Sequence, residues 1–281
     1  MCSSDLQTRP GQEVVLDFDS HVFNNEVGGA PLIGQLQMRP TKTERGFLTP
    51  DQVREALRPA NIHVPETGLV CIENTHNRHG GTCCTPEEIT AVAGVAHEAG
   101  VPVHLDGARL FNAAVALTRP AADFARHVDS VTFCLSKGLA APVGSVICGG
   151  RELIERARRW RKMLGGGMRQ VGVLAAAGIV SLERMVDRLA EDHANARRLG
   201  EGLAALPGLR VNLPTVQTNI VIVGIERGAA AAGELVRGCA ARKVKVHAMS
   251  PTAIRCVTHK DVDAEDISRA LDAFRELTNR W

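Results

Sequence analysis

Short apolar runs that alternate with helical stretches are the feature that most constrains the fold of this 281-residue chain. Val14–Phe18 and the runs "TGLVCI", "VPVHL" and "SVTFCL" are nearly continuously apolar, and polar residues follow each of them. Strands that are buried on both faces have this composition. Because helical segments separate the runs, the order predicts an α/β fold with a mostly parallel, helix-covered sheet.

Capping residues place several helix boundaries. Thr49 or Asp51 can cap the helix "PDQVREALR", and Thr85 precedes a proline and two glutamates at the start of a helix that Gly100 ends. "RPAADFARHV" predicts a further helix, whereas "MRPTKTERGFLTP" is rich in turn-forming residues and predicts a loop.

The pattern changes after Arg151. A basic amphipathic helix, the glycine loop "LGGGMRQ" and two long helices lead into a segment with the order strand, strand, helix, strand, strand, helix. We predict a large domain over residues 1–181 and a smaller α+β domain over residues 182–281.

Composition excludes several functional classes. Hydrophobic residues make up 44% of the chain and charged residues 23%, as in ordinary globular proteins. A net charge of +2, the absence of tyrosine and only 3% aromatic residues argue against nucleic acid and anionic membranes as partners. The basic cluster Arg156–Lys162 is interpreted as a solvated helix face.

Location can also be predicted. The longest apolar run, Val171–Val180, is too short to cross a bilayer, and the first residues lack the apolar region of a signal peptide. Eight cysteines without a C-x-x-C pair are typical of buried, reduced thiols. We therefore expect a cytoplasmic protein without a zinc or other metal site.

Polar residues follow four of the predicted strands, in the segments "DSH", "ENTHN", "DGAR" and "SKG". In parallel sheets, ligands bind beyond the carboxyl ends of the strands. Since these four segments fall at such ends, we expect them to form one site.

Lys137 and Asp106 indicate the chemistry of that site. A lysine between apolar strands is costly unless it is paired or neutralised, and the lowered pKa of a buried lysine suits Schiff-base formation. A Schiff-base lysine and a carboxylate for the pyridine nitrogen are what pyridoxal phosphate requires. Alternatively, Lys137 is a loop lysine that reaches solvent and Asp106 caps the next helix. Their positions at consecutive strand ends favour the cofactor.

Five segments together resemble the L-threonine aldolase family of low-specificity type, within the β-eliminating lyase branch of fold-type-I pyridoxal phosphate enzymes. They are "LDFDSHVFNNEVGGA", "CIENTHNRHGGT", "VHLDGARLFNAA", "DSVTFCLSKGLAAPVGSVICG" and "RKMLGGGMRQ". The resemblance implies an aspartate aminotransferase-like fold and retro-aldol cleavage of L-threonine or L-allo-threonine to glycine and acetaldehyde.

The resemblance also implies residue roles at the cofactor. Lys137 forms the Schiff base, Asp106 contacts the pyridine nitrogen, and Ser136 contributes to phosphate binding. His21 stacks on the cofactor ring and His76 lies near the substrate hydroxyl. The base that takes the hydroxyl proton is either His76 or a water near His21. A lone histidine is more often a structural residue, but both of these occupy segments that match the family.

Basic residues complete the implied site. Arg109 lies near the phenolic oxygen of the cofactor or near the substrate, and Arg255 in "TAIRCVTH" binds the substrate carboxylate. Lys162 and Arg169 reach an active site near a subunit interface, so a homodimer or homotetramer is expected. Surface charge is the alternative for both, and a flexible turn is the alternative for Gly165–Gly167.

One departure from the family concerns the beginning of the chain. In the family, the segment before "TRPGQEV" supplies the first part of the large domain and a phosphate cradle, which "MCSSDL" does not resemble. We therefore expect an N-terminally truncated chain that binds pyridoxal phosphate weakly. Two other functions are considered: a β-eliminating lyase of the same fold, and an inactive subunit that retains only its intersubunit contacts.

Overall fold

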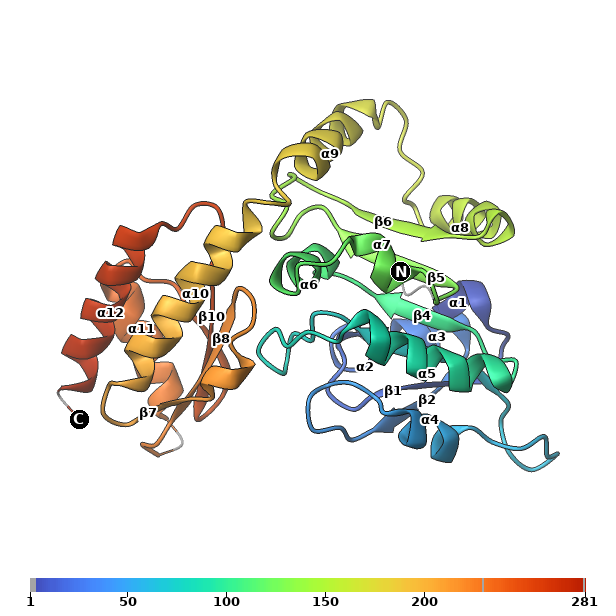
Figure 1. Cartoon of the computed structure of the whole chain (residues 1–281), viewed down its shortest axis with the longest axis horizontal. Helices are drawn as coiled ribbons and strands as arrows, with labels where there is room; N and C mark the ends of the chain where they lie inside the picture. The colour runs from blue at the N-terminus through green and yellow to red at the C-terminus, as the bar shows by residue number, and fades with distance from the viewer. Residues whose placement is uncertain (1–3, 229, 280) are drawn as a thin grey trace. The chain divides into compact units, whose positions relative to one another are not determined.

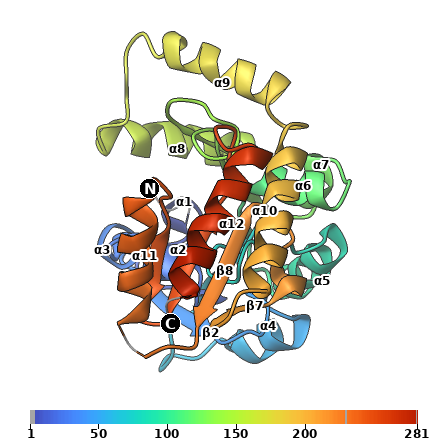
Figure 2. The ribbon, with the colours of Figure 1, turned by 90° about the vertical axis from the view of Figure 1, so that its left-hand side faces the viewer.

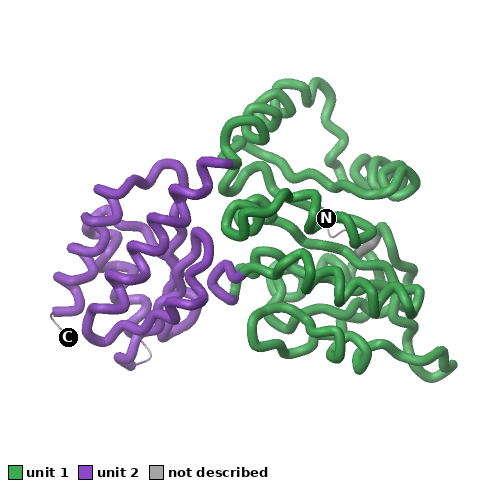
Figure 3. The backbone as a smooth tube through the Cα atoms, in the orientation of Figure 1, with its two compact units in different colours: residues 1–78, 83–186 green, residues 79–82, 187–281 purple. Residues whose placement is uncertain are grey.

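The computed structural model describes residues 4–228, 230–279 and 281 (Figure 1 and, turned by 90°, Figure 2). These residues form two compact units (Figure 3). The first unit holds the chain up to residue 78 together with residues 83–186, and the second holds residues 79–82 together with the chain from residue 187 onward.

A six-stranded sheet forms the centre of the first unit, in the order β2-β1-β3-β4-β5-β6. Strands β1 to β5 are parallel, and β6 runs antiparallel to β5. The strands are β1 (Glu13–Asp17), β2 (Gln37–Thr41), β3 (Thr67–Glu73), β4 (Val103–Asp106), β5 (Ser130–Cys134) and β6 (Ser145–Gly149). The prediction of a mostly parallel sheet is confirmed, and the carboxyl ends of β1, β3, β4 and β5 share one edge of it.

Strand β2 corrects the prediction of a loop over "MRPTKTERGFLTP". Residues 38–41 of that segment pair with β1, with Pro40 opposite Leu16. Pro40 has no N–H to donate, but β2 is the edge strand, where a missing donor leaves no neighbouring carbonyl unpaired. Turn-forming residues therefore did not exclude a strand here.

The described residues of the first unit also form helices. They are α1 (Ser4–Gln7), α2 (His21–Asn24), α3 (Gly29–Gly34), α4 (Pro50–Ala56), α5 (Pro86–Glu98), α6 (Leu110–Ala116), α7 (Ala121–Ala125), α8 (Arg151–Met163) and α9 (Gly172–Arg184). The predicted starts of α4 and α5 are confirmed. The Thr49 hydroxyl accepts the Gln52 N–H and the Thr85 hydroxyl accepts the Glu88 N–H, and a proline follows each threonine.

The two faces of the sheet differ in chemistry. Val70, Leu105 and Val131 belong to the core cluster that also contains residues of α4, α5 and α7. On the opposite face, Leu16 and Leu69 pack with residues of α2 and α3. Farther along that second face, β4 and β5 carry polar side chains in place of apolar ones, namely His104, Asp106 and Thr132. The alternation of side chains thus places these polar groups on one surface.

A four-stranded antiparallel sheet forms the second unit, in the order β7-β8-β10-β9. Its elements follow the predicted order after a first helix: α10 (Leu189–Ala204), β7 (Leu209–Val211), a 3-10 turn (Leu213–Thr215), β8 (Ile220–Ile225), α11 (Ala231–Ala241), β9 (His247–Ser250), β10 (Ala253–Val257) and α12 (Ala264–Thr278). Figure 2 shows the three helices side by side over the sheet, where they enclose an apolar core.

None of the helices in the described part of the chain combines the length and apolar character that a bilayer crossing requires.

Candidate active site

A hollow of about 170 Å³ lies on the polar part of the sheet, in the first unit. Residues of β4, β5 and β6 and of the segments after β1, β4 and β5 line it: His21, Val22, Glu26, His104, Asp106, Ala108, Thr132, Cys134, Lys137 and Ser145. Three of the predicted site residues, His21, Asp106 and Lys137, are thereby brought together.

Asp106 is the buried carboxylate of this hollow. Its Oδ1 accepts the N–H of Ala108 at 3.2 Å, whereas Arg109 is the N-cap residue of α6 and the helix receives no side-chain cap. Asp106 therefore does not cap that helix. Burial and the nearby charge of Glu73 raise the pKa of Asp106 to about 6, although the Lys137 ammonium lowers it. A cation at this carboxylate would favour its ionised form.

Lys137 follows β5 and is half-buried at the hollow. It is thus neither fully solvated nor sealed in the core. Its charge acts on Asp106, since the two groups line the same cavity. An amine and a carboxylate therefore line the same hollow, where both can contact one bound molecule.

His21 begins α2 at the mouth of the hollow. Its backbone N–H donates to Glu73 Oε2 at 2.6 Å, and its Nε2 lies 3.1 Å from Glu26 Oε1. The imidazole is 35% exposed, so it can contact a bound molecule. The His21 ring is therefore the accessible imidazole among the predicted histidines.

His76, in contrast, is fully buried and is not among the residues that line the hollow. Its Nε2 lies 3.0 Å from Asp17 Oδ1 and 3.8 Å from Glu73 Oε2. Burial lowers the pKa of His76, but the hydrogen bond to Asp17 and the charge of Glu73 outweigh it, so the pKa is raised. For Asp17, burial raises the pKa, and hydrogen bonds from His76 and Thr43 reverse that effect and lower it. Both shifts favour the ionised form of the pair.

The other predicted residues lie outside the lining. Arg109 donates from Nη1 to Asn77 Oδ1 at 3.4 Å, and the exposed Ser136 donates to the Gly144 carbonyl at 3.4 Å. Lys162 at the end of α8 and Arg169 in the loop after it are both exposed. Arg255 belongs to the second unit, where it lies on β10 opposite Ile222 of β8.

Two residues of this region received no role from the sequence. His104 is buried at the hollow, with Nδ1 2.7 Å from Ser130 Oγ, and burial lowers its pKa to about 3, so the ring is neutral. Glu73 ends β3, and its carboxylate is also buried. Each of them is a polar residue within an otherwise apolar strand, and this pattern could have identified them from the sequence. Both lie on the same face of the sheet as Asp106.

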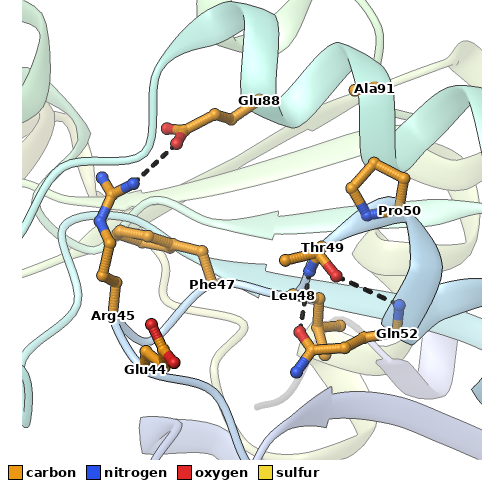
Figure 4. Close-up of a pocket in the computed structure, with 9 residues that line it drawn as sticks. All are labelled: Glu44, Arg45, Phe47, Leu48, Thr49, Pro50, Gln52, Glu88 and Ala91. Carbon is orange, nitrogen blue, oxygen red and sulfur yellow. Dashed lines mark hydrogen bonds and ion pairs between the residues drawn. The ribbon is translucent and has the colours of Figure 1, made fainter.

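A second hollow, of about 520 Å³, lies beside the start of α4 (Figure 4). Two of its charged side chains are paired with each other, because Arg45 Nη1 lies 2.9 Å from Glu88 Oε1, and Thr49 and Gln52 are engaged in the helix cap. Figure 4 shows these pairs along its wall. It offers a ligand no free amine or carboxylate pair comparable to Lys137 and Asp106.

The chain is similar to known proteins over most of its length. The model of the family described as "Beta-eliminating lyase" matches residues 2–226. "Low-specificity L-threonine aldolase 1" of Arabidopsis thaliana is 39% identical over 270 residues, which cover 95% of this chain and 75% of that protein. "Low specificity L-threonine aldolase" of Escherichia coli (strain K12) is 40% identical over 272 residues, which cover 96% of this chain and 78% of that protein.

Solved structures show the same fold. The chain resembles the threonine aldolase of Leishmania major with a TM-score of 0.82 and 21% identity, over 98% of this chain and 80% of that one. It resembles an aspartate aminotransferase from Rhodobacter sphaeroides with a TM-score of 0.74 and 19% identity, over 99% of this chain and 73% of that one. The predicted aspartate aminotransferase-like fold is confirmed.

Proposed function

The chain belongs to the beta-eliminating lyase family, among the low-specificity L-threonine aldolases, and from this membership we propose how its residues carry out the reaction. It is a pyridoxal phosphate-dependent lyase that cleaves L-threonine to glycine and acetaldehyde. The observation that carries the proposed assignment of residues is the shared hollow of Lys137 and Asp106.

The groups present fit the cofactor. Lys137 offers an amine for its aldehyde, and Asp106 offers a buried carboxylate for its pyridine nitrogen. The raised pKa of Asp106 supports this fit. It means that the ionised carboxylate is unfavourable in the protein alone, and a ligand with a positive charge would stabilise it. When bound, pyridoxal phosphate supplies a ring that stabilises the negative charge left on Cα as the Cα–Cβ bond breaks.

Access to the hollow distinguishes the two candidates for the base. His76 is fully buried and is not among the residues that line the hollow, so it is poorly placed to take a proton from a bound substrate. The partly exposed His21 lines the hollow. Of the two candidates, we therefore favour a water held by His21 as the group that takes the proton of the substrate hydroxyl. His76 then has a structural role, beside Asp17 and Glu73.

Basic residues are proposed to bind the anionic groups. Arg109 faces the phenolic oxygen of the cofactor or the substrate, and Arg255 binds the substrate carboxylate through a planar guanidinium. Ser136 contributes to phosphate binding, and Lys162 and Arg169 reach a site near a subunit interface. These roles rest on the resemblance of the surrounding segments to the family.

Assembly and location are part of the proposal. We propose a homo-oligomer, either a dimer or a tetramer, of a cytoplasmic enzyme in which residues 1–181 form the cofactor domain and residues 182–281 the small domain. Exposed apolar side chains over 163–182, among them Met163, Met168 and Val173, support self-association. The seven cysteines of the described residues are free thiols, which fits a reducing compartment.

Product analysis tests the proposal. The purified chain is incubated with pyridoxal phosphate and either L-threonine or L-serine, and glycine, acetaldehyde and pyruvate are measured. We expect glycine and acetaldehyde from threonine in equal amounts, and loss of both products in Lys137→Ala. Pyruvate from serine at a higher rate than glycine from threonine would instead indicate a β-eliminating enzyme.

A further inference from the structure

Glu73 is a buried carboxylate that the proposed reaction does not use. It is the last residue of β3, its side chain is 5% exposed, and it pairs in register with Asp106 on β4. An ionised side chain at such a site is costly unless hydrogen bonds compensate for the lost water. The partners of this carboxylate therefore indicate its purpose.

Both oxygens of Glu73 accept backbone N–H groups, and the donors belong to different loops. Oε2 accepts the N–H of His21 at 2.6 Å, and Oε1 accepts the N–H of Asn77 at 2.9 Å. His21 begins the short helix after β1, and Asn77 lies in the loop after β3. One carboxylate thus fixes two loops at the edge of the sheet where the strand order reverses.

Each of these loops leads to a residue of the proposed site. The first carries the imidazole of His21 at the mouth of the hollow. In the second, the Asn77 side chain accepts a hydrogen bond from Arg109 at 3.4 Å. The N-cap residue of α2, Ser20, forms no side-chain cap, so the Glu73 carboxylate takes the place of that cap at the helix start.

We propose that Glu73 is a positioning residue for the active site: its carboxylate holds the His21 backbone at the mouth of the hollow and the Asn77 loop beside Arg109. The inference rests on the proposed function, since it takes His21 and Arg109 as parts of the site. Glu73 acts through these residues and touches neither substrate nor cofactor. Its charge also supports the site, because it favours a cation beside Asp106.

Glu73→Gln is the informative substitution. Glutamine keeps the size of the side chain but has one oxygen and one NH2 group, so one of the two backbone N–H groups faces a donor. Glu13→Gln is the matched control, because Glu13 is also a fully buried carboxylate at a strand end of the same sheet. It lies at the opposite edge, where Arg39, Arg58 and Thr67 are its partners.

Amide hydrogen exchange of the cofactor-free chain is the first measurement. The hydrogen bonds to a charged acceptor predict that exchange at His21 and Asn77 becomes about tenfold faster or more in Glu73→Gln. Glu13→Gln should leave both amides at the wild-type rate. Equal rates in the two variants would overturn the proposal. If Glu73→Gln does not fold, Glu73→Asp serves instead, because it keeps the charge but is too short to reach both loops.

Pyridoxal phosphate binding, followed by absorbance, is the second measurement. We expect the dissociation constant to rise about tenfold in Glu73→Gln and to stay unchanged in Glu13→Gln. In a His21→Ala background, the effect of Glu73→Gln should shrink at least threefold on this binding constant, because the imidazole to be positioned is gone. An undiminished effect in that background contradicts the inference.

The two measurements separate this inference from the proposed function. Failure of the wild-type chain to bind pyridoxal phosphate would count against the proposed function, while the exchange experiment still tests Glu73 alone. Normal binding by the wild type together with normal binding and exchange in Glu73→Gln would refute the positioning role and leave the proposed function intact.

Discussion

Replacement of Asp106 by asparagine should stabilise the cofactor-free protein at neutral pH while it weakens cofactor binding. Asparagine has nearly the same shape and can still accept the N–H of Ala108, but it carries no charge. The buried carboxylate has a pKa of about 6, against 3.8 for an unperturbed aspartate. Its ionisation in the folded state is therefore costly, and asparagine removes that cost.

The magnitude follows from the difference in pKa. A gap of about 2 units corresponds to about 3 kcal/mol. The sign follows from proton binding: the folded state holds its proton up to about pH 6 and the unfolded state releases it near pH 3.8, so stability falls as pH rises between these values. Above pH 6 the full penalty applies. Asp106→Asn should then be more stable than the wild type by up to about 3 kcal/mol at pH 8, and the difference should nearly vanish near pH 4.

Urea denaturation of the cofactor-free chain measures this difference. The two tryptophans are Trp160 and Trp281, and Trp281→Phe leaves Trp160 on α8 as a fluorescence probe of the first unit alone. Free energies of unfolding at pH 8 and pH 4.5 are compared for both forms, and pyridoxal phosphate affinity is measured at pH 8. A stability difference between variant and wild type that is the same at both pH values, or a variant that binds the cofactor as tightly as the wild type, would refute the reasoning.

Three further outcomes are expected. Borohydride reduction of the chain with pyridoxal phosphate should place the pyridoxyl group on Lys137, as peptide mapping will reveal; label only on other lysines would end that assignment. Arg255→Lys should raise KM for threonine about tenfold or more, because a point charge replaces a bidentate guanidinium, and an unchanged KM would place the substrate carboxylate elsewhere. Thr85→Ala should lower the free energy of unfolding of the first unit by about 1 kcal/mol, since the capping box of α5 is lost; a value near zero in the Trp160 assay would contradict this.

Much of the fold could be predicted because a strand that is buried on both faces appears in the sequence as an apolar run. The strands β3, β4 and β5 are nearly continuously apolar, and the caps of α4 and α5 use side chains that satisfy the first free N–H groups. The edge strand β2 could not be found this way. Its residues are only partly buried, and Pro40 is tolerated there for a reason that depends on strand order, which local composition does not contain.

The site was predictable only in part, for a related reason. Asp106 ends β4, and Lys137 and His21 follow β5 and β1, so the rule that carboxyl ends gather at one edge was sufficient to bring them together. The pairing of His76 with Asp17 and of Glu73 with the His21 N–H depends on contacts between residues far apart in the chain. Such contacts decide whether a histidine faces a ligand or a carboxylate, and the spacing of residues does not reveal them.

The three buried carboxylates at this edge, Asp17, Glu73 and Asp106, show how the surroundings separate structural from functional charge. Asp17 has His76 and Thr43 as partners, and its pKa is lowered. Glu73 accepts two backbone N–H groups. Asp106, among the hydrogen bonds of the described residues, accepts the N–H of Ala108, and its pKa is raised. Burial is similar for all three, so the difference lies in their partners. Asp106 is the carboxylate whose charge the folded chain stabilises least, and a cationic ring nitrogen is the kind of group that would stabilise it.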